Sequence, residues 1–181
     1  SDNVVYVGGE NSKGRIFVFD RKGAYLWTLE MPDVENGKID SIRFAANGRD
    51  LIVTDAFAKQ AVYRVNPVAG TWTELVSVAS TAGTSGALGG RVRDALEAPD
   101  GTLYVAASGG VIAFNAQGQF VKKIATGIHV GLALDVAGNR LFYSLQDGRI
   151  SKIDLATEET TMIQTRSMDT NSALQLVWRD G

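Results

Sequence analysis

Short segments rich in β-branched and aromatic residues alternate with turn dipeptides along the whole chain. Three dipeptides each precede such a segment: Asn47-Gly48 before LIVTD (51–55), Asp100-Gly101 before TLYVAA (102–107) and Gly138-Asn139 before RLFYS (140–144). Dipeptides of this kind are typical of β-hairpin turns, and the segments between them lack the 3.6-residue period of an amphipathic helix. The pattern therefore predicts consecutive hairpins and an all-β chain.

The hairpins belong to a larger repeat of four strands. After each predicted hairpin strand comes a further strand, in the copies GRIFVFD (14–20), AVYRVN (61–66), GVIAFN (110–115) and GRISKID (148–154). A polar turn then leads to the outer strands AYLWTLE (24–30), TWTELVS (71–77), QFVKKIA (119–125) and ETTMIQT (159–165). Apolar segments with small residues precede the hairpins and predict inner strands: SIRFAA (41–46), DALEAP (94–99) and GLALDV (131–136). Four strands repeating about every 40 to 50 residues are typical of a β-propeller blade.

The two ends of the chain carry complementary parts of one blade. The first unit starts at its second strand, VVYVGG (4–9), whereas an extra apolar segment, SALQLVWRDG (172–181), follows the last unit. If the latter supplies the missing inner strand, no inner edge is left unpaired. We therefore expect a closed ring of about four four-stranded blades. The alternative is four blades of a larger ring, whose ends would be complementary in the same way.

Composition narrows the functional classes. The chain has 181 residues, of which 45% are hydrophobic, so we expect one domain over residues 1–181. Its formal charge is only -2 and no basic stripe is present, so nucleic acid is not an expected partner. No apolar stretch reaches the ~20 residues of a membrane span. Without cysteine, disulfides, thiolate metal sites and cysteine nucleophiles are excluded.

Oligomeric state and location follow less directly. A closed ring needs no partner, so we expect a monomer. The chain begins at Ser1 rather than Met, which suggests a processed or trimmed chain. The compartment is left open, with a secreted or periplasmic location favoured.

Two segments, GRIFVFDRKGAYLWTLEMP (14–32) and APDGTLYVAASGGVIAFNAQGQFVKKIATG (98–127), resemble the repeats of NHL and SMP-30/gluconolactonase propellers. The resemblance covers nearly the whole chain and implies a propeller fold. SMP-30-like lactonases hold a divalent metal at their centre through carboxylate and Asn side chains at the starts of inner strands. The resemblance therefore also implies such a metal site. The corresponding positions here are Asp40, Arg93 and Val130. Only Asp40 offers a side-chain oxygen ligand. The comparison therefore favours a propeller fold and disfavours a metal-dependent lactonase activity.

Polar residues gather where the inner strands are expected to begin. In a propeller these starts converge around the central axis, which predicts a mouth of mixed charge. The candidate ligand-binding residues are Asp40, Arg91, Arg93, Asp94, His129, Asp169 and Asn171. An ion pair of Arg93 with Asp40 or Asp94 that closes the mouth is the alternative.

A weaker pattern concerns metal. Asp33, Glu35 and Asp40 surround Gly37 and loosely resemble a calcium loop, although their spacing departs from the EF-hand pattern. No cofactor is otherwise expected, and a solvated turn is the competing interpretation.

The sequence therefore predicts a non-catalytic binding domain that presents loops on one face to a small polar ligand or to a protein or peptide. The first alternative is a metal-dependent hydrolase or lactonase with a relocated site at Asp40, Asp94, His129 and Asp169. The second is a structural assembly module.

Overall fold

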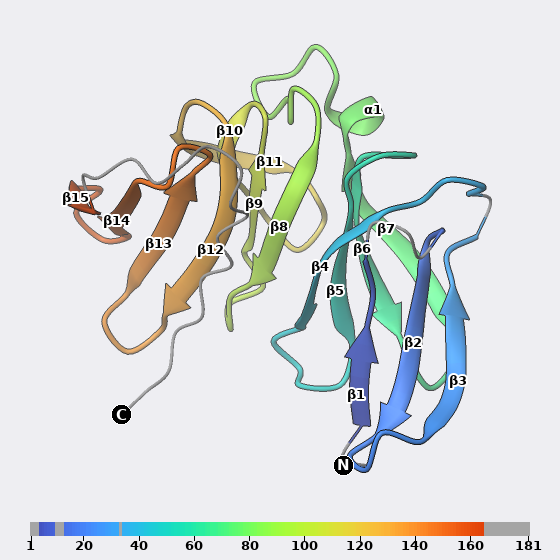
Figure 1. The fold of residues 1–181 in the computed structure, drawn as a ribbon. Helices are drawn as coiled ribbons and strands as arrows, with labels where there is room; N and C mark the ends of the chain where they lie inside the picture. Colours follow the sequence, from blue (N-terminus) through green and yellow to red (C-terminus); the bar gives the residue numbers. More distant parts are fainter. Residues whose placement is uncertain (1–3, 10–12, 33, 165–181) are drawn as a thin grey trace.

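The computed structural model describes residues 4–9, 13–32 and 34–164. Nearly all of its regular structure is antiparallel β-sheet, in four sheets that follow one another along the chain (Figure 1). The first holds β1 (Val4–Val7), β2 (Arg15–Asp20) and β3 (Tyr25–Glu30). The second holds β4 (Ile39–Phe44), β5 (Leu51–Asp55), β6 (Ala61–Asn66) and β7 (Thr71–Ser77). The third holds β8 (Val92–Glu97), β9 (Leu103–Ala107), β10 (Gly110–Phe114) and β11 (Phe120–Ala125). The fourth holds β12 (His129–Asp135), β13 (Arg140–Leu145), β14 (Ile150–Asp154) and β15 (Thr160–Gln164).

Within each sheet, strands that are consecutive in the sequence are hydrogen-bonded neighbours. This is the order predicted from the repeat, and it confirms the four-strand unit in the second, third and fourth sheets. The described part of the first sheet has three strands, so its inner position is not filled by a described residue.

The sheets pack face to face, and alternation along the strands supplies a core to both faces. In β5, Leu51 and Val53 face the first sheet, whereas Ile52 faces the third. In β9, Val105 faces the second sheet and Tyr104 faces the fourth. Because successive side chains of a strand point to opposite faces, a strand between two cores must be apolar throughout. This explains why both strands are buried along their whole length.

The four sheets form an open array in the described part of the chain. Three apolar cores join the first sheet to the second, the second to the third and the third to the fourth. Figure 1 places the first and fourth sheets at the two ends of this array. The expected closed ring is therefore not found among the described residues. The strand predicted to close it, Ser172–Trp178, lies outside them.

Polar contacts at the C-terminal ends of the inner strands also join the second and third sheets. The Glu97 side chain at the end of β8 pairs with Arg64 of β6 and accepts a hydrogen bond of 2.9 Å from the Ala46 backbone N–H. Arg64 Nη1 also lies 3.6 Å from Asp50 Oδ2. The carboxylate thus satisfies groups of the second sheet that apolar packing would leave unpaired.

The Gly-rich segment between the second and third sheets is held at several points. It begins with a short helix, α1 (Val78–Thr81), which Ser77 caps by accepting a hydrogen bond from the Ser80 N–H. The Thr81 hydroxyl accepts a hydrogen bond from the Leu88 N–H, and the Leu88 side chain is buried in the core between these sheets.

Among the described residues, no helix is long and apolar enough to span a bilayer.

Candidate functional site: the inner-strand entrances

The three described inner strands, β4, β8 and β12, begin two residues earlier than the sequence pattern predicted, and each contains a register shift at that point. Ile39 pairs with Asp55 and Ser41 with Thr54, so Asp40 has no partner in the β4–β5 register. The same shift lies between Val92 and Asp94, and between His129 and Gly131. A β-bulge inserts one residue and re-aims its side chain. Pattern reasoning missed the shift because a bulge breaks the two-residue alternation on which strand prediction depends.

The residues in these bulges are Asp40, Arg93 and Val130, the three positions that the sequence comparison treated as equivalent. The structure therefore supports their equivalence in the repeat. It also brings two of them together, because Arg93 Nη1 lies 3.5 Å from Asp40 Oδ2. The side chains are 22% and 13% exposed, respectively, so this pair lies at the edge of solvent. The Nε atom of Arg93 is buried with no hydrogen-bond partner among the described residues.

Asp94 lies next to this pair but makes different contacts. Its Oδ1 accepts hydrogen bonds from the Ser41 hydroxyl (2.6 Å) and Arg43 Nε (2.8 Å). Its Oδ2 accepts from Arg43 Nη2 (2.5 Å) and from the Leu132 N–H (2.8 Å). Arg43 also donates to the Leu132 carbonyl. One carboxylate, 2% exposed, thus joins the inner strands of three sheets, and a ligand role for it would require exchanging these bonds.

Sequence reasoning did not identify Arg43 as part of this network. The available signal was its position in SIRFAA, two residues after Ser41 and therefore on the same side of the strand. A charged residue within a predicted inner strand requires a partner, because an unpaired buried charge is strongly unfavourable. The partner was not predictable, since it lies 51 residues away in another sheet.

The loop between β5 and β6 lies beside the entrance of β4 and is organised by Asp55. This buried carboxylate accepts hydrogen bonds from five backbone N–H groups, those of Lys38, Phe57, Ala58, Lys59 and Gln60. The loop conformation is therefore fixed from within. Its aromatic residue, Phe57, is nevertheless 52% exposed.

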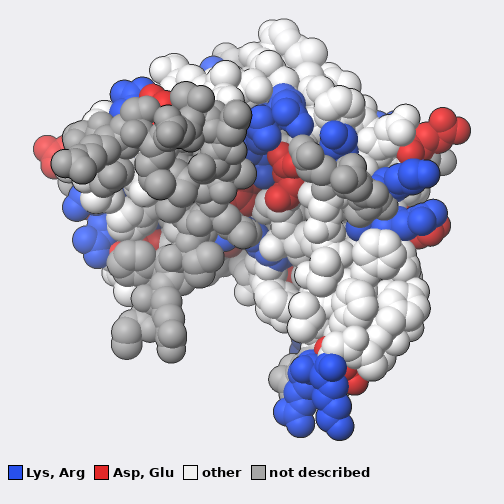
Figure 2. Space-filling model, in the orientation of Figure 1, with Lys and Arg blue, Asp and Glu red and all other residues white. Residues whose placement is uncertain are grey.

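Two cations lie against the Phe57 ring. Lys38 Nζ is 4.5 Å from the ring centroid and Arg91 Cζ is 5.7 Å from it, both within the range of cation–π attraction. Figure 2 shows basic and acidic side chains gathered near the upper ends of β8 and β4. We call the end of the molecule that carries these groups, formed by the loops 37–38, 56–60, 78–91 and 126–128, the entrance face.

The remaining predicted site residues either lie away from the Asp40–Arg93 pair or fall outside the described residues. His129 is the first residue of β12 and so belongs to the entrance face by position. Glu35 lines a hollow beside Arg15 and Glu30, away from the Asp40–Arg93 pair. Asp33, Asp169 and Asn171 lie outside the described residues, so their predicted roles stay predictions. In the described part of the chain, no three His, Asp or Glu side chains are close enough to share a metal ion.

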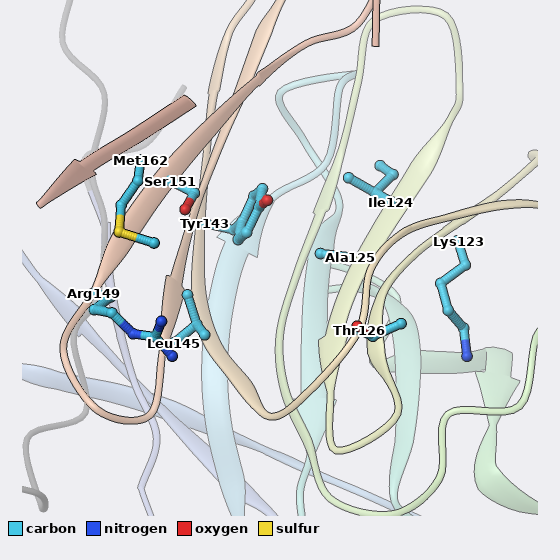
Figure 3. A pocket seen from close by; sticks show the side chains of 9 residues that line it. All are labelled: Lys123, Ile124, Ala125, Thr126, Tyr143, Leu145, Arg149, Ser151 and Met162. Atoms are coloured by element: carbon cyan, nitrogen blue, oxygen red, sulfur yellow. The ribbon is translucent and has the colours of Figure 1, made fainter. Parts of the chain in front are cut away.

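A separate shallow cavity of about 490 Å³ lies between the third and fourth sheets (Figure 3). Its walls come from β11, β13, β14 and β15, and they include Ile124, Tyr143, Leu145, Arg149 and Met162. Neither a carboxylate nor an imidazole is among its lining residues. Arg149 is paired with Asp147 at 2.8 Å.

The resolved pKa shifts belong mainly to turns and to buried tyrosines. The Gly138 N–H and the Arg140 guanidinium lower the pKa of Asp135, and the Arg149 N–H and side chain lower that of Asp147. Backbone N–H groups of Thr157 and Ala156 lower the pKa of Asp154, and Lys122 lowers that of Glu158. Burial raises the pKa of Tyr6, Tyr63 and Tyr104. These are the effects of turn capping, ion pairing and core packing, and none requires a catalytic role.

Comparison with known proteins supports the fold. No family model matches this chain, and no curated protein matches it. Among solved structures, a chain in the crystal structure of a nidogen/laminin complex is similar, with a TM-score of 0.74 and 16% sequence identity. The match covers 98% of this chain but only 65% of the other, so the present chain spans slightly less than two thirds of its structural neighbour. At this identity the likeness concerns the fold alone, and it supports the conclusion that the four sheets are blades of a β-propeller.

Proposed function

We propose that this chain is a non-catalytic binding domain that presents its entrance face to a protein or peptide partner. The observation that carries the proposal is Phe57, a half-exposed aromatic ring at a loop fixed by a buried carboxylate. Exposed aromatic residues and arginines on pre-organised loops are the side chains that most often dominate interface energetics. The structural neighbour supports the proposal at the level of the fold, because its structure is a complex between two proteins.

The hydrolase alternative needs carboxylates that can bind a metal or activate water. Asp40 is paired with Arg93, and both oxygens of Asp94 accept hydrogen bonds from protein groups. A metal would have to displace a guanidinium from either carboxylate. These contacts favour binding over hydrolysis, and we infer that the NHL- and SMP-30-like repeats serve as a scaffold here.

We also propose that residues 172–178 complete the first sheet as its inner strand and that the protein is a monomer. What supports this is β1, whose Val5 and Val7 side chains are 50% and 45% exposed. An apolar strand at the edge of a sheet is a site for pairing with a further strand. A second copy of the chain would be the competing occupant, and light scattering at micromolar concentration separates a monomer from a dimer.

The binding function is tested by titrating isotope-labelled protein with pools of short random peptides and following backbone amide shifts. We expect saturable shifts in residues 37–40, 55–60 and 88–93. The turns at the other end, 21–24, 45–50 and 98–102, serve as internal controls and should not respond. Absence of saturable shifts on the entrance face would contradict the proposal. Lactone hydrolysis that a chelator abolishes and a divalent ion restores would also contradict it.

A further inference from the structure

The surroundings of Phe57 indicate the charge of its partner. Lys38, Lys59 and Arg91 lie on the loops around the ring, whereas Asp40, Asp55 and Arg93 lie at the ends of the adjoining strands. Asp40 faces Arg93, and Asp55 is buried and occupied by backbone N–H groups. Neither Lys38 nor Lys59 forms an ion pair with a described carboxylate. We call Lys38, Phe57, Lys59, Arg91 and Arg93 the Phe57 cluster.

The charged side chains of this cluster are positive, whereas the formal charge of the whole chain is negative. The formal net charge is -2, whereas the described loops around Phe57 carry Lys38 and Lys59, which form no ion pair with a described carboxylate. A local potential that opposes the net charge steers a complementary partner to one place and disfavours general adsorption of polyanions. The cluster is also compact, without the extended stripe that a nucleic-acid backbone needs.

We propose that the Phe57 cluster binds a short acidic segment of a protein partner, with carboxylates at Lys38 and Lys59 and an apolar side chain on the exposed ring. This inference rests on the proposed binding function and specifies the partner of the same face. Lys38 Nζ lies 4.5 Å from the ring centroid, and Lys59 is an exposed residue of the same fixed loop as Phe57, so a segment that carries acidic residues next to an apolar residue matches this arrangement. The Asp55-bound loop holds the ring in place before binding, which lowers the entropy lost on association.

The probe is a labelled peptide with two glutamates on each side of a leucine, and its control has glutamines in place of the glutamates. We expect saturable binding of the acidic peptide, weakened by added salt, with amide shifts centred on Phe57. The glutamine peptide should bind at least about tenfold more weakly, since charge–charge attraction supplies much of the affinity.

The deciding variants are the double substitution Lys38→Gln with Lys59→Gln and the single substitution Phe57→Ser. Both should weaken binding of the acidic peptide about tenfold or more while the amide spectrum of the strands is retained. The matched control replaces two exposed cations of the β2–β3 turn, Arg21→Gln with Lys22→Gln, which removes the same charge at the opposite end. It should bind as the wild type does. If the double substitution unfolds the protein, Phe57→Ser alone decides.

Three results would overturn the inference: equal binding of the two peptides, equal loss in the control variant, or tighter binding of a single-stranded oligonucleotide than of the acidic peptide. Titration with the peptide pools distinguishes failure of this inference from failure of the proposed binding function. Shifts on the entrance face with the pools, but none with the acidic peptide, would leave the binding function standing and reject the acidic partner.

Discussion

Asp94 and Arg43 illustrate how a single ion pair holds several blades of this fold in register. The Asp94 carboxylate accepts four hydrogen bonds, the pair is largely buried, and it reaches the backbone of β12 through Leu132. Partly satisfied buried networks are costly, because each remaining charge loses its solvation without compensation. The residues therefore act as a link between sheets rather than as surface decoration.

Replacing Arg43 tests this role. Arg43→Ala leaves the Asp94 carboxylate buried with two of its four hydrogen bonds, so we expect a loss of about 3 kcal/mol in the free energy of unfolding. Arg15→Ala is the control, because its pair with Glu30 is exposed and should contribute less than about 1 kcal/mol. Chemical denaturation measures both, and similar small losses would argue against the network.

A second residue-scale prediction concerns acid. The pKa of Asp135 in the folded state lies below its ordinary value of 3.8, because the Gly138 N–H and Arg140 favour the charged form. A carboxyl with a lowered folded-state pKa stabilises the protein above the unfolded pKa, and this contribution disappears as the pH falls through the folded pKa. Asp135→Asn should therefore lower the melting temperature at neutral pH, and the difference from wild type should shrink below the ordinary pKa. A difference independent of pH would contradict this assignment.

At the scale of strands and turns, the sequence predicted most of what forms. LIVTD, AVYRVN and TWTELVS coincide with β5, β6 and β7 because alternation and turn dipeptides define their ends. The starts of the inner strands were wrong by two residues, since Asp40, Arg93 and Val130 lie in bulges. The pairing of Arg93 with Asp40 was one of the alternatives, whereas the Phe57 cluster was not predicted. Its members come from three separated parts of the chain, and only the packing of the second and third sheets brings them together.

The β9–β10 turn provides a test of local geometry. Gly110 has a φ of 135°, and an added Cβ would collide with the Ala125 carbonyl oxygen of β11. We expect Gly110→Ala to destabilise the fold by more than about 2 kcal/mol. Gly23→Ala is the control, because its φ is 85° but no atom lies near the added Cβ. That change should cost only about 1 kcal/mol, and equal effects on the melting curve would show that the collision is relieved without cost.

At the scale of the whole molecule, the proposed completion of the first sheet has a direct consequence. Deleting residues 172–181 should expose the apolar edge of β1 and lower the melting temperature by roughly 5 °C or more. Replacing the same segment by an equally long Gly/Ser sequence should have the same effect, since it removes the apolar side chains and keeps the length. If either variant melts as the wild type does, this segment does not complete the sheet.

The central claim is that the entrance face binds a partner and that its Arg93–Asp40 pair is not merely a closed internal contact. The most direct measurement is thermal denaturation of Arg93→Ala together with its binding of the acidic peptide. Because the 3.5 Å pair is longer and more exposed than the Arg43–Asp94 pair, we expect a smaller stability loss than for Arg43→Ala, together with clearly weaker peptide binding. A loss of about 1 to 3 kcal/mol with unchanged binding would instead show that Arg93 serves the fold and would contradict the account.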